Sequence, residues 1–209
     1  AYATEIDEKY RDSEQQTFRG FLDKLTQLDA GKKRFDALAW TEFPKSIRVL
    51  LDNPDAVQRA HADFVAAGAG VVITASYQVS RWGFEQAGMT ADDADAALRA
   101  STQAARGAVA GAQTRVAASV GPYGAILHDG SEYRGRYGRT HRELVDFHRE
   151  RLGVLWSAGP DLLACETIPD IVEVRALADL VGEAAAPAWL ALSCADGGHL
   201  RDGTPVEEA

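Results

Sequence analysis

The sequence predicts an α/β fold that forms part of a TIM-type (βα)8 barrel. From Leu50 onward, short and continuously apolar segments alternate with segments of helical periodicity, which is typical of a parallel sheet buried on both faces. An open doubly wound sheet also fits this alternation, but no glycine-rich nucleotide-binding motif follows any apolar segment. A complete barrel takes about 250 residues, and only four strands are expected here, so the chain is predicted to supply part of a barrel.

Helix boundaries are marked by capping residues. Asn53 and Pro54 suit the start of a helix that Gly68 would end. Thr140 and Glu143 form a capping box for a later helix that would end near residue 159. Two further helices are predicted over about residues 92–110 and from about residue 170, because apolar residues recur there at helical spacing. The predicted strands are 71–74, 116–120, 161–165 and 188–192.

A long loop after the second predicted strand is the most unusual segment. It begins with Gly121 and Pro122, and it carries Tyr123, Tyr133 and Tyr137 within 15 residues. In α/β proteins, ligands bind at loops that follow the carboxyl ends of strands. We therefore expect this loop to form a pocket wall, with an ordinary surface excursion as the alternative.

Composition divides the chain into two parts. Residues 1–46 are rich in charged residues and glutamine, and their apolar residues recur at helical spacing, which predicts a divergent helical N-terminal segment. Residues 47–209 are predicted to be the N-terminal part of the barrel domain.

Charge and hydrophobicity limit the function classes. Hydrophobic residues make up 46% and charged residues 25% of the chain, as in soluble globular proteins. The net charge of −9 argues against nonspecific nucleic-acid binding. No apolar run is long enough to span a bilayer, and no secretory leader is visible. The two cysteines, Cys165 and Cys194, do not make a disulfide framework, and free thiols favour a cytoplasmic location.

Polar residues follow two predicted strands where catalytic groups of barrels collect. Glu166 comes directly after the strand that ends at Cys165, where a carboxylate could bind a substrate ammonium group or act as an acid or base. Its alternative role is to stabilise the start of the next helix. Ser76, Tyr77 and Gln78 follow an earlier strand and could orient a polar ligand, with capping as the alternative for Ser76.

No metal site is predicted from the residues themselves. Cys165 and Cys194 lie on separate predicted strands without a third ligand, which is weak support for a metal and fits small core residues better. His141 and His148 are seven positions apart, unlike the tight spacing of helical zinc motifs.

Several longer motifs occur in the order found in one enzyme family. The matching segments are Asp52–Pro54, Ala66–Ala69, Ile73–Gln78, Ser119–Ala125, Asp129–Tyr137, Phe147–Arg149, Leu163–Pro169 and Asp196–Thr204. Together they resemble the homocysteine S-methyltransferases, most closely the branch that uses S-methylmethionine. The resemblance covers about residues 50–204 and is incomplete at both ends.

The resemblance implies a chemistry and a set of partners. It implies an enzyme that moves a methyl group from S-methylmethionine, or S-adenosylmethionine, to the homocysteine thiolate to make methionine. It implies a barrel that binds zinc through three cysteines on later strands, so that Cys165 and Cys194 match positions that are not ligands. It also implies that Glu166 holds the homocysteine amino group. The family's Asp-Gly-Gly turn is absent near Thr4 and Glu5.

Two function hypotheses stay open at this point. The first is a methyltransferase of which this chain is an incomplete piece. The second is a catalytically inactive partial-barrel binding or interaction protein that lacks the zinc cysteines. Homocysteine and a sulfonium methyl donor are the expected partners, with neither nucleic acid nor membrane, and self-association is expected from unpaired strand edges.

Overall fold

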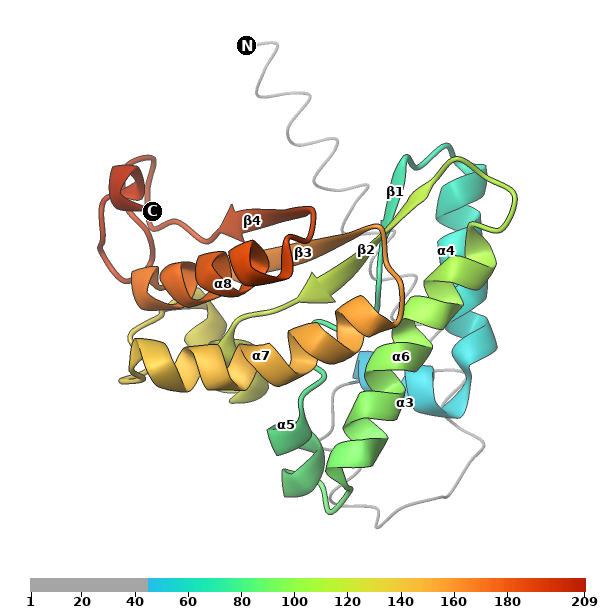
Figure 1. Ribbon diagram of the computed structural model, residues 1–209, viewed down its shortest axis with the longest axis horizontal. Coiled ribbons are helices and arrows are strands. Elements are labelled where there is room, and N and C mark those ends of the chain that lie inside the picture. The colour runs from blue at the N-terminus through green and yellow to red at the C-terminus, as the bar shows by residue number, and fades with distance from the viewer. Residues whose placement is uncertain (1–44) are drawn as a thin grey trace.

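The computed structural model describes residues 45–209, which form a parallel sheet and its covering helices (Figure 1). Nearly all of the predicted N-terminal segment, 1–46, lies outside the described residues, so its helix and its boundary with 47–209 stay predictions. The strands are β1 (Val71–Ile73), β2 (Arg115–Val120), β3 (Leu162–Ile168) and β4 (Ala188–Leu192). The helices are α3 (Lys45–Asp52), α4 (Pro54–Ala66), α5 (Arg81–Gln86), α6 (Ala91–Ala108), α7 (His141–Ser157) and α8 (Ile171–Ala184).

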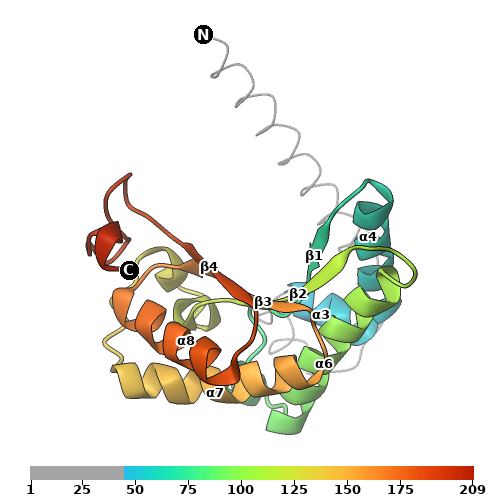
Figure 2. The same cartoon turned by 45° about the horizontal axis from the view of Figure 1, so that its top comes forward.

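The strands are arranged as they are in a barrel wall. Their order in the sheet is β1-β2-β3-β4, and every neighbouring pair is parallel. A doubly wound sheet would reverse its strand order at a switch point, whereas this sheet winds in one direction only. Figure 2 shows α4, α6, α7 and α8 on one side of the sheet. The predicted fold class, part of a (βα)8 barrel, is confirmed.

The two faces of the sheet carry different residues because side chains alternate along a strand. The face toward the helices belongs to the main core, to which the central strands contribute Ala118, Val120, Leu163 and Cys165. The opposite face, which would line the barrel interior, carries a smaller buried cluster formed by Ala117, Leu162 and Ala164, packed against Val71 and Trp189. Residues in phase with this second cluster, including Ser119 and Glu166, therefore face the interior.

Two of the helix caps are those that the sequence predicts. The Asn53 side chain accepts a hydrogen bond from the Ala56 amide at 3.2 Å, and Thr140 and Glu143 form a capping box at the start of α7. Asp170 caps α8. None of the helices in the described part of the chain is long and apolar enough to cross a membrane.

One expectation about the strands is wrong, and one short helix was missed. The third strand was expected to end at Cys165, yet β3 continues to Ile168, so that Glu166 lies within the strand and not after it. The helix α5 was not predicted, because its six residues are too short for a periodic pattern and begin after a Ser80 cap.

Candidate functional site

An irregularity in β3 sets the direction of Glu166. The pairing of β3 with β4 shifts between Cys165 and Ile168, so that one extra residue is inserted there. Thr167 has a φ of 63°, a conformation that a β-branched residue rarely adopts. Such bulges re-aim side chains next to active sites. As a result Cys165 and Ile168 both pack into the helix-side core, and Glu166 between them faces the interior.

Glu166 is held by a single side chain on the neighbouring strand. The Ser119 hydroxyl donates a hydrogen bond of 2.7 Å to Glu166 Oε2, and the structure gives Oε1 no hydrogen-bond partner among the described residues. Burial raises the pKa of Glu166, and the hydrogen bond from Ser119 opposes this rise. The carboxylate is therefore poorly solvated and has one oxygen available to a cationic ligand.

A hydroxyl network joins the ends of β1 and β2 beside this pair. Ser76 Oγ donates to the Ser119 carbonyl at 2.7 Å, and Thr74 Oγ1 lies 2.7 Å from Ser76 Oγ. Because the Ser76 proton is used on the carbonyl, Thr74 must donate to Ser76, and it accepts from the Ser119 amide at 2.9 Å. Ser76 is completely buried. Its hydroxyl thus fixes the strand ends and is not exposed to a ligand.

Tyr77 and Gln78 lie against the loop that follows β2. Gln78 Nε2 donates to the Ala125 carbonyl at 3.1 Å. The Tyr77 ring packs so closely on Gly121 that a Cβ there would lie 2.8 Å from ring carbons, which only glycine avoids. Burial raises the pKa of Tyr77 to about 12, so its hydroxyl stays protonated at neutral pH. Of the four predicted site residues, Glu166 and Tyr77 remain half-buried and partly accessible, and Gln78 is tied to the loop.

Buried charges from the helix layer reach the same strand ends. Arg151 of α7 donates to the carbonyls of Gly121 and Tyr77 at 3.0 and 2.9 Å. Glu173 of α8 accepts from His148 Nε2 at 2.8 Å and from the Tyr123 amide at 2.5 Å. The sequence offered a signal for this group, since His148 and Arg151 occupy the apolar face of α7 that also carries Leu144 and Leu155. Ser119 was also missed as a site residue.

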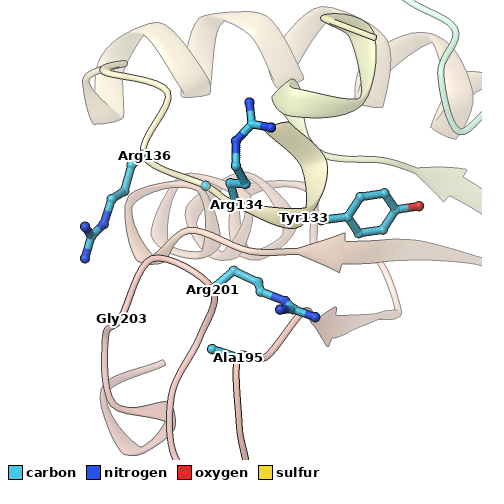
Figure 3. Close-up of a pocket in the computed structure, with 7 residues that line it drawn as sticks. Tyr133, Arg134, Arg136, Ala195, Arg201 and Gly203 are labelled. Atoms are coloured by element: carbon cyan, nitrogen blue, oxygen red, sulfur yellow. The ribbon is translucent and has the colours of Figure 1, made fainter. Parts of the chain in front are cut away.

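An open groove of about 530 Å³ lies between the loop after β2 and the segment after β4 (Figure 3). Two of its arginines serve the fold, because Arg134 donates to the Asp129 carbonyl and Arg136 to the Asp202 carbonyl. Figure 3 shows the Arg134, Arg136 and Arg201 side chains pointing in different directions. None of the predicted site residues lines this groove, whose lining residues are Tyr133, Arg134, Gly135, Arg136, Ala195, Arg201 and Gly203.

The residues of the described region do not fit a zinc ion. No group of three His, Cys, Asp or Glu side chains within residues 45–209 could hold a metal. Burial raises the pKa of the Cys165 thiol to about 12, and zinc binds the thiolate form. Cys165 and Cys194 are free thiols, and that neither is a ligand stays a prediction.

Known proteins with similar sequences are named for the same activity. A sequence model of the family "Homocysteine S-methyltransferase" matches residues 1–209. The chain is 40% identical over 175 residues to homocysteine S-methyltransferase YbgG of Bacillus subtilis, covering 78% of this chain and 56% of the relative. It is 41% identical over 201 residues to homocysteine S-methyltransferase 4 of Zea mays, covering 88% of this chain and 57% of the relative. The chain thus spans a little over half the length of these curated relatives.

A solved structure is similar to this chain in both sequence and fold. The metallated form of the homocysteine methyltransferase MmuM from Escherichia coli superposes with a TM-score of 0.76 at 41% identity, covering 88% of this chain and 65% of that chain. The oxidized form gives the same TM-score and identity. At this level of sequence identity and coverage, the likeness reflects common ancestry, and the chain belongs to the homocysteine S-methyltransferase family.

Proposed function

We propose that this chain provides the homocysteine-binding strands of a homocysteine S-methyltransferase, and that Glu166 binds the homocysteine ammonium group. The observation that carries the proposal is the Glu166–Ser119 pair on the interior face of the sheet. One carboxylate oxygen is fixed by the Ser119 hydroxyl at 2.7 Å, which leaves the other for a ligand. The relatives named for this activity support the choice of homocysteine.

The electrostatics of Glu166 suit an ammonium ligand. Its pKa is raised because burial disfavours the carboxylate, and a cation that binds next to it restores the lost stabilisation of the charge. Tyr77 and Gln78 complete the proposed site from the end of β1, with the protonated Tyr77 hydroxyl as a hydrogen-bond donor. Ser76 contributes only by holding β1 to β2, because its hydroxyl is buried and engaged.

The proposed reaction moves a methyl group between two sulfur atoms. The homocysteine thiolate forms a new S–CH3 bond while the sulfonium donor loses its methyl group and its positive charge, with no change in oxidation state. S-methylmethionine is the proposed donor, with S-adenosylmethionine as the other, and the cytoplasm is the proposed compartment, in accord with the free thiols of Cys165 and Cys194.

Calorimetric titration with homocysteine under reducing conditions tests the assignment of Glu166. Glu166→Gln keeps the shape and removes the charge, and a charge-assisted hydrogen bond is worth roughly 1.5–3 kcal/mol. The Kd should therefore rise roughly 10- to 150-fold. Glu85→Gln is the matched control, because Glu85 is an exposed residue of α5 and should leave the Kd unchanged. Equal affinities of the wild type and Glu166→Gln would return Glu166 to a structural role.

A further inference from the structure

Arg151 joins two segments of the proposed site from the helix layer. Its side chain is almost completely buried, and its guanidinium donates to the carbonyls of Tyr77 at 2.9 Å and Ser76 at 3.5 Å at the end of β1. It also donates to the Gly121 carbonyl at 3.0 Å at the end of β2. A single buried cation thus holds both strand ends, which are separate in the sequence.

Glu173 holds the start of the loop that follows β2, at Tyr123. It is completely buried and accepts from the Tyr123 amide at 2.5 Å and from His148 Nε2 at 2.8 Å. A carboxylate can only accept, so His148 carries its proton on Nε2, and burial lowers the pKa of His148 and keeps it neutral. Glu173 and Arg151 also interact electrostatically.

Stability alone does not explain why charged residues such as Arg151 and Glu173 are buried here. Removing charged side chains from water costs several kcal/mol per ion, and a buried ion pair often does no better than apolar residues of the same volume. Moreover, Arg151 bonds three backbone carbonyls and no carboxylate among its hydrogen-bond partners. Its five fixed donors suit it to gather several acceptors in one geometry. What these bonds fix is the backbone that carries Ser76 and Tyr77, together with the turn that follows Ser119.

We propose that Arg151 and Glu173 are positioning residues, which fix the backbone of residues 76–77 and 121–123 and thereby the Ser119–Glu166 pair. The connection runs through Ser76, whose backbone carbonyl accepts from Arg151 and whose hydroxyl donates to the Ser119 carbonyl. The consequence for homocysteine rests on the proposed function. The predicted effect on the two backbone segments, 76–77 and 121–123, does not depend on the proposed function.

Hydrogen–deuterium exchange of the 209-residue chain tests the positioning role directly, with Arg151→Met, Arg151→Lys and Glu173→Gln as variants. Arg151→Met should speed amide exchange in residues 74–78 and 119–125 while α4 and α6 keep their protection. Arg151→Lys keeps the charge, reaches fewer carbonyls, and should give a smaller effect. Arg149→Met is the matched control, because Arg149 lies on α7, half-exposed, in a surface pair with Glu183, and it should change neither segment.

Homocysteine affinity is the second readout. A displaced binding group typically costs up to about 100-fold, so Arg151→Met should weaken binding roughly 10- to 100-fold, with partial recovery in Arg151→Lys. Unchanged exchange in both segments, or exchange that rises evenly over the whole chain, would overturn the positioning role. If the wild type binds no homocysteine, the proposed function fails while exchange still decides the role of Arg151. If Arg151→Met does not fold, Arg151→Lys and Glu173→Gln decide in its place.

Discussion

At the scale of single residues, Glu166 is unusual because burial makes its ionised form less favourable. Burial raises its pKa above that of an ordinary glutamate, and the strained Thr167 beside it, with a φ of 63°, maintains the bulge that turns it to the interior. Strain of this kind persists only where the surrounding structure enforces it, and it gathers at functional sites. The strain at Thr167 therefore supports the proposal that this strand end, with Glu166, forms part of the substrate site.

Under the proposed function, the raised pKa of Glu166 predicts that homocysteine binding depends on pH. The free protein takes up a proton on Glu166 at a higher pH than an ordinary glutamate would, and only the carboxylate pairs with an ammonium ion. We expect the Kd for homocysteine to rise as the pH falls from 7 through the raised pKa of Glu166. The measurement is a titration series between pH 7.5 and 5, and Glu166→Gln should show a flat profile. A profile shared by both proteins would assign the titration to another group.

At the scale of elements, local signals predicted the ends of most helices and strands. The caps at Asn53 and Thr140 could be found because capping is a local contact within three residues. The bulge in β3 could not, because it arises from pairing with β4, and so the strand was predicted too short. Likewise, the sequence indicated Glu166 but not its partner Ser119, because the two residues lie on different strands and are 47 positions apart in the sequence.

Asp161 stabilises the end of the sheet that lies opposite the site. Its carboxylate accepts from Arg106 of α6 through Nη1 and Nη2 at 2.9 and 2.8 Å, and from the Val116 amide at 2.7 Å. Hydrogen bonds to Arg106 are the main cause of its lowered pKa. Because the folded pKa lies below the unfolded one, this stabilisation is present above the unfolded pKa and is lost as the pH falls through the folded value.

Asp161→Asn should lower the free energy of unfolding at pH 7 by about 1–3 kcal/mol, because it removes the charge from these hydrogen bonds. Urea denaturation measures the change. Asp146→Asn is the control, since Asp146 is an exposed residue of α7 whose pairing with Arg142 is 4.0 Å long, and it should change stability by no more than about 0.5 kcal/mol. Equal stability of Asp161→Asn and the wild type would show that the cluster does not fasten the sheet.

At the scale of the whole molecule, the sheet has two edges in the part of the chain that the structure describes. β1 pairs only with β2, and β4 only with β3. Unpaired strand edges act as templates for pairing between molecules. We expect the 209-residue chain to self-associate, so that its apparent mass in size-exclusion chromatography with light scattering rises with concentration. A compact monomer that melts cooperatively at all concentrations would contradict this expectation.

The chain should hold zinc weakly or not at all. The described residues offer no three-ligand cluster, and the raised pKa of Cys165 opposes formation of its thiolate. Metal analysis after dialysis is expected to give far less than one zinc per chain. Stoichiometric, tightly held zinc that is lost in Cys165→Ser and Cys194→Ser would overturn this prediction.

The central claim, that Glu166 binds the homocysteine ammonium group, is tested most directly by a cycle of four dissociation constants. The wild type and Glu166→Gln are each titrated with homocysteine and with 4-mercaptobutyrate, which keeps the thiol and the carboxylate but lacks the amino group. We predict that Glu166→Gln weakens homocysteine binding roughly 10- to 150-fold and leaves the affinity for 4-mercaptobutyrate nearly unchanged. An equal loss for both ligands, or a wild type that does not prefer homocysteine, would contradict the account.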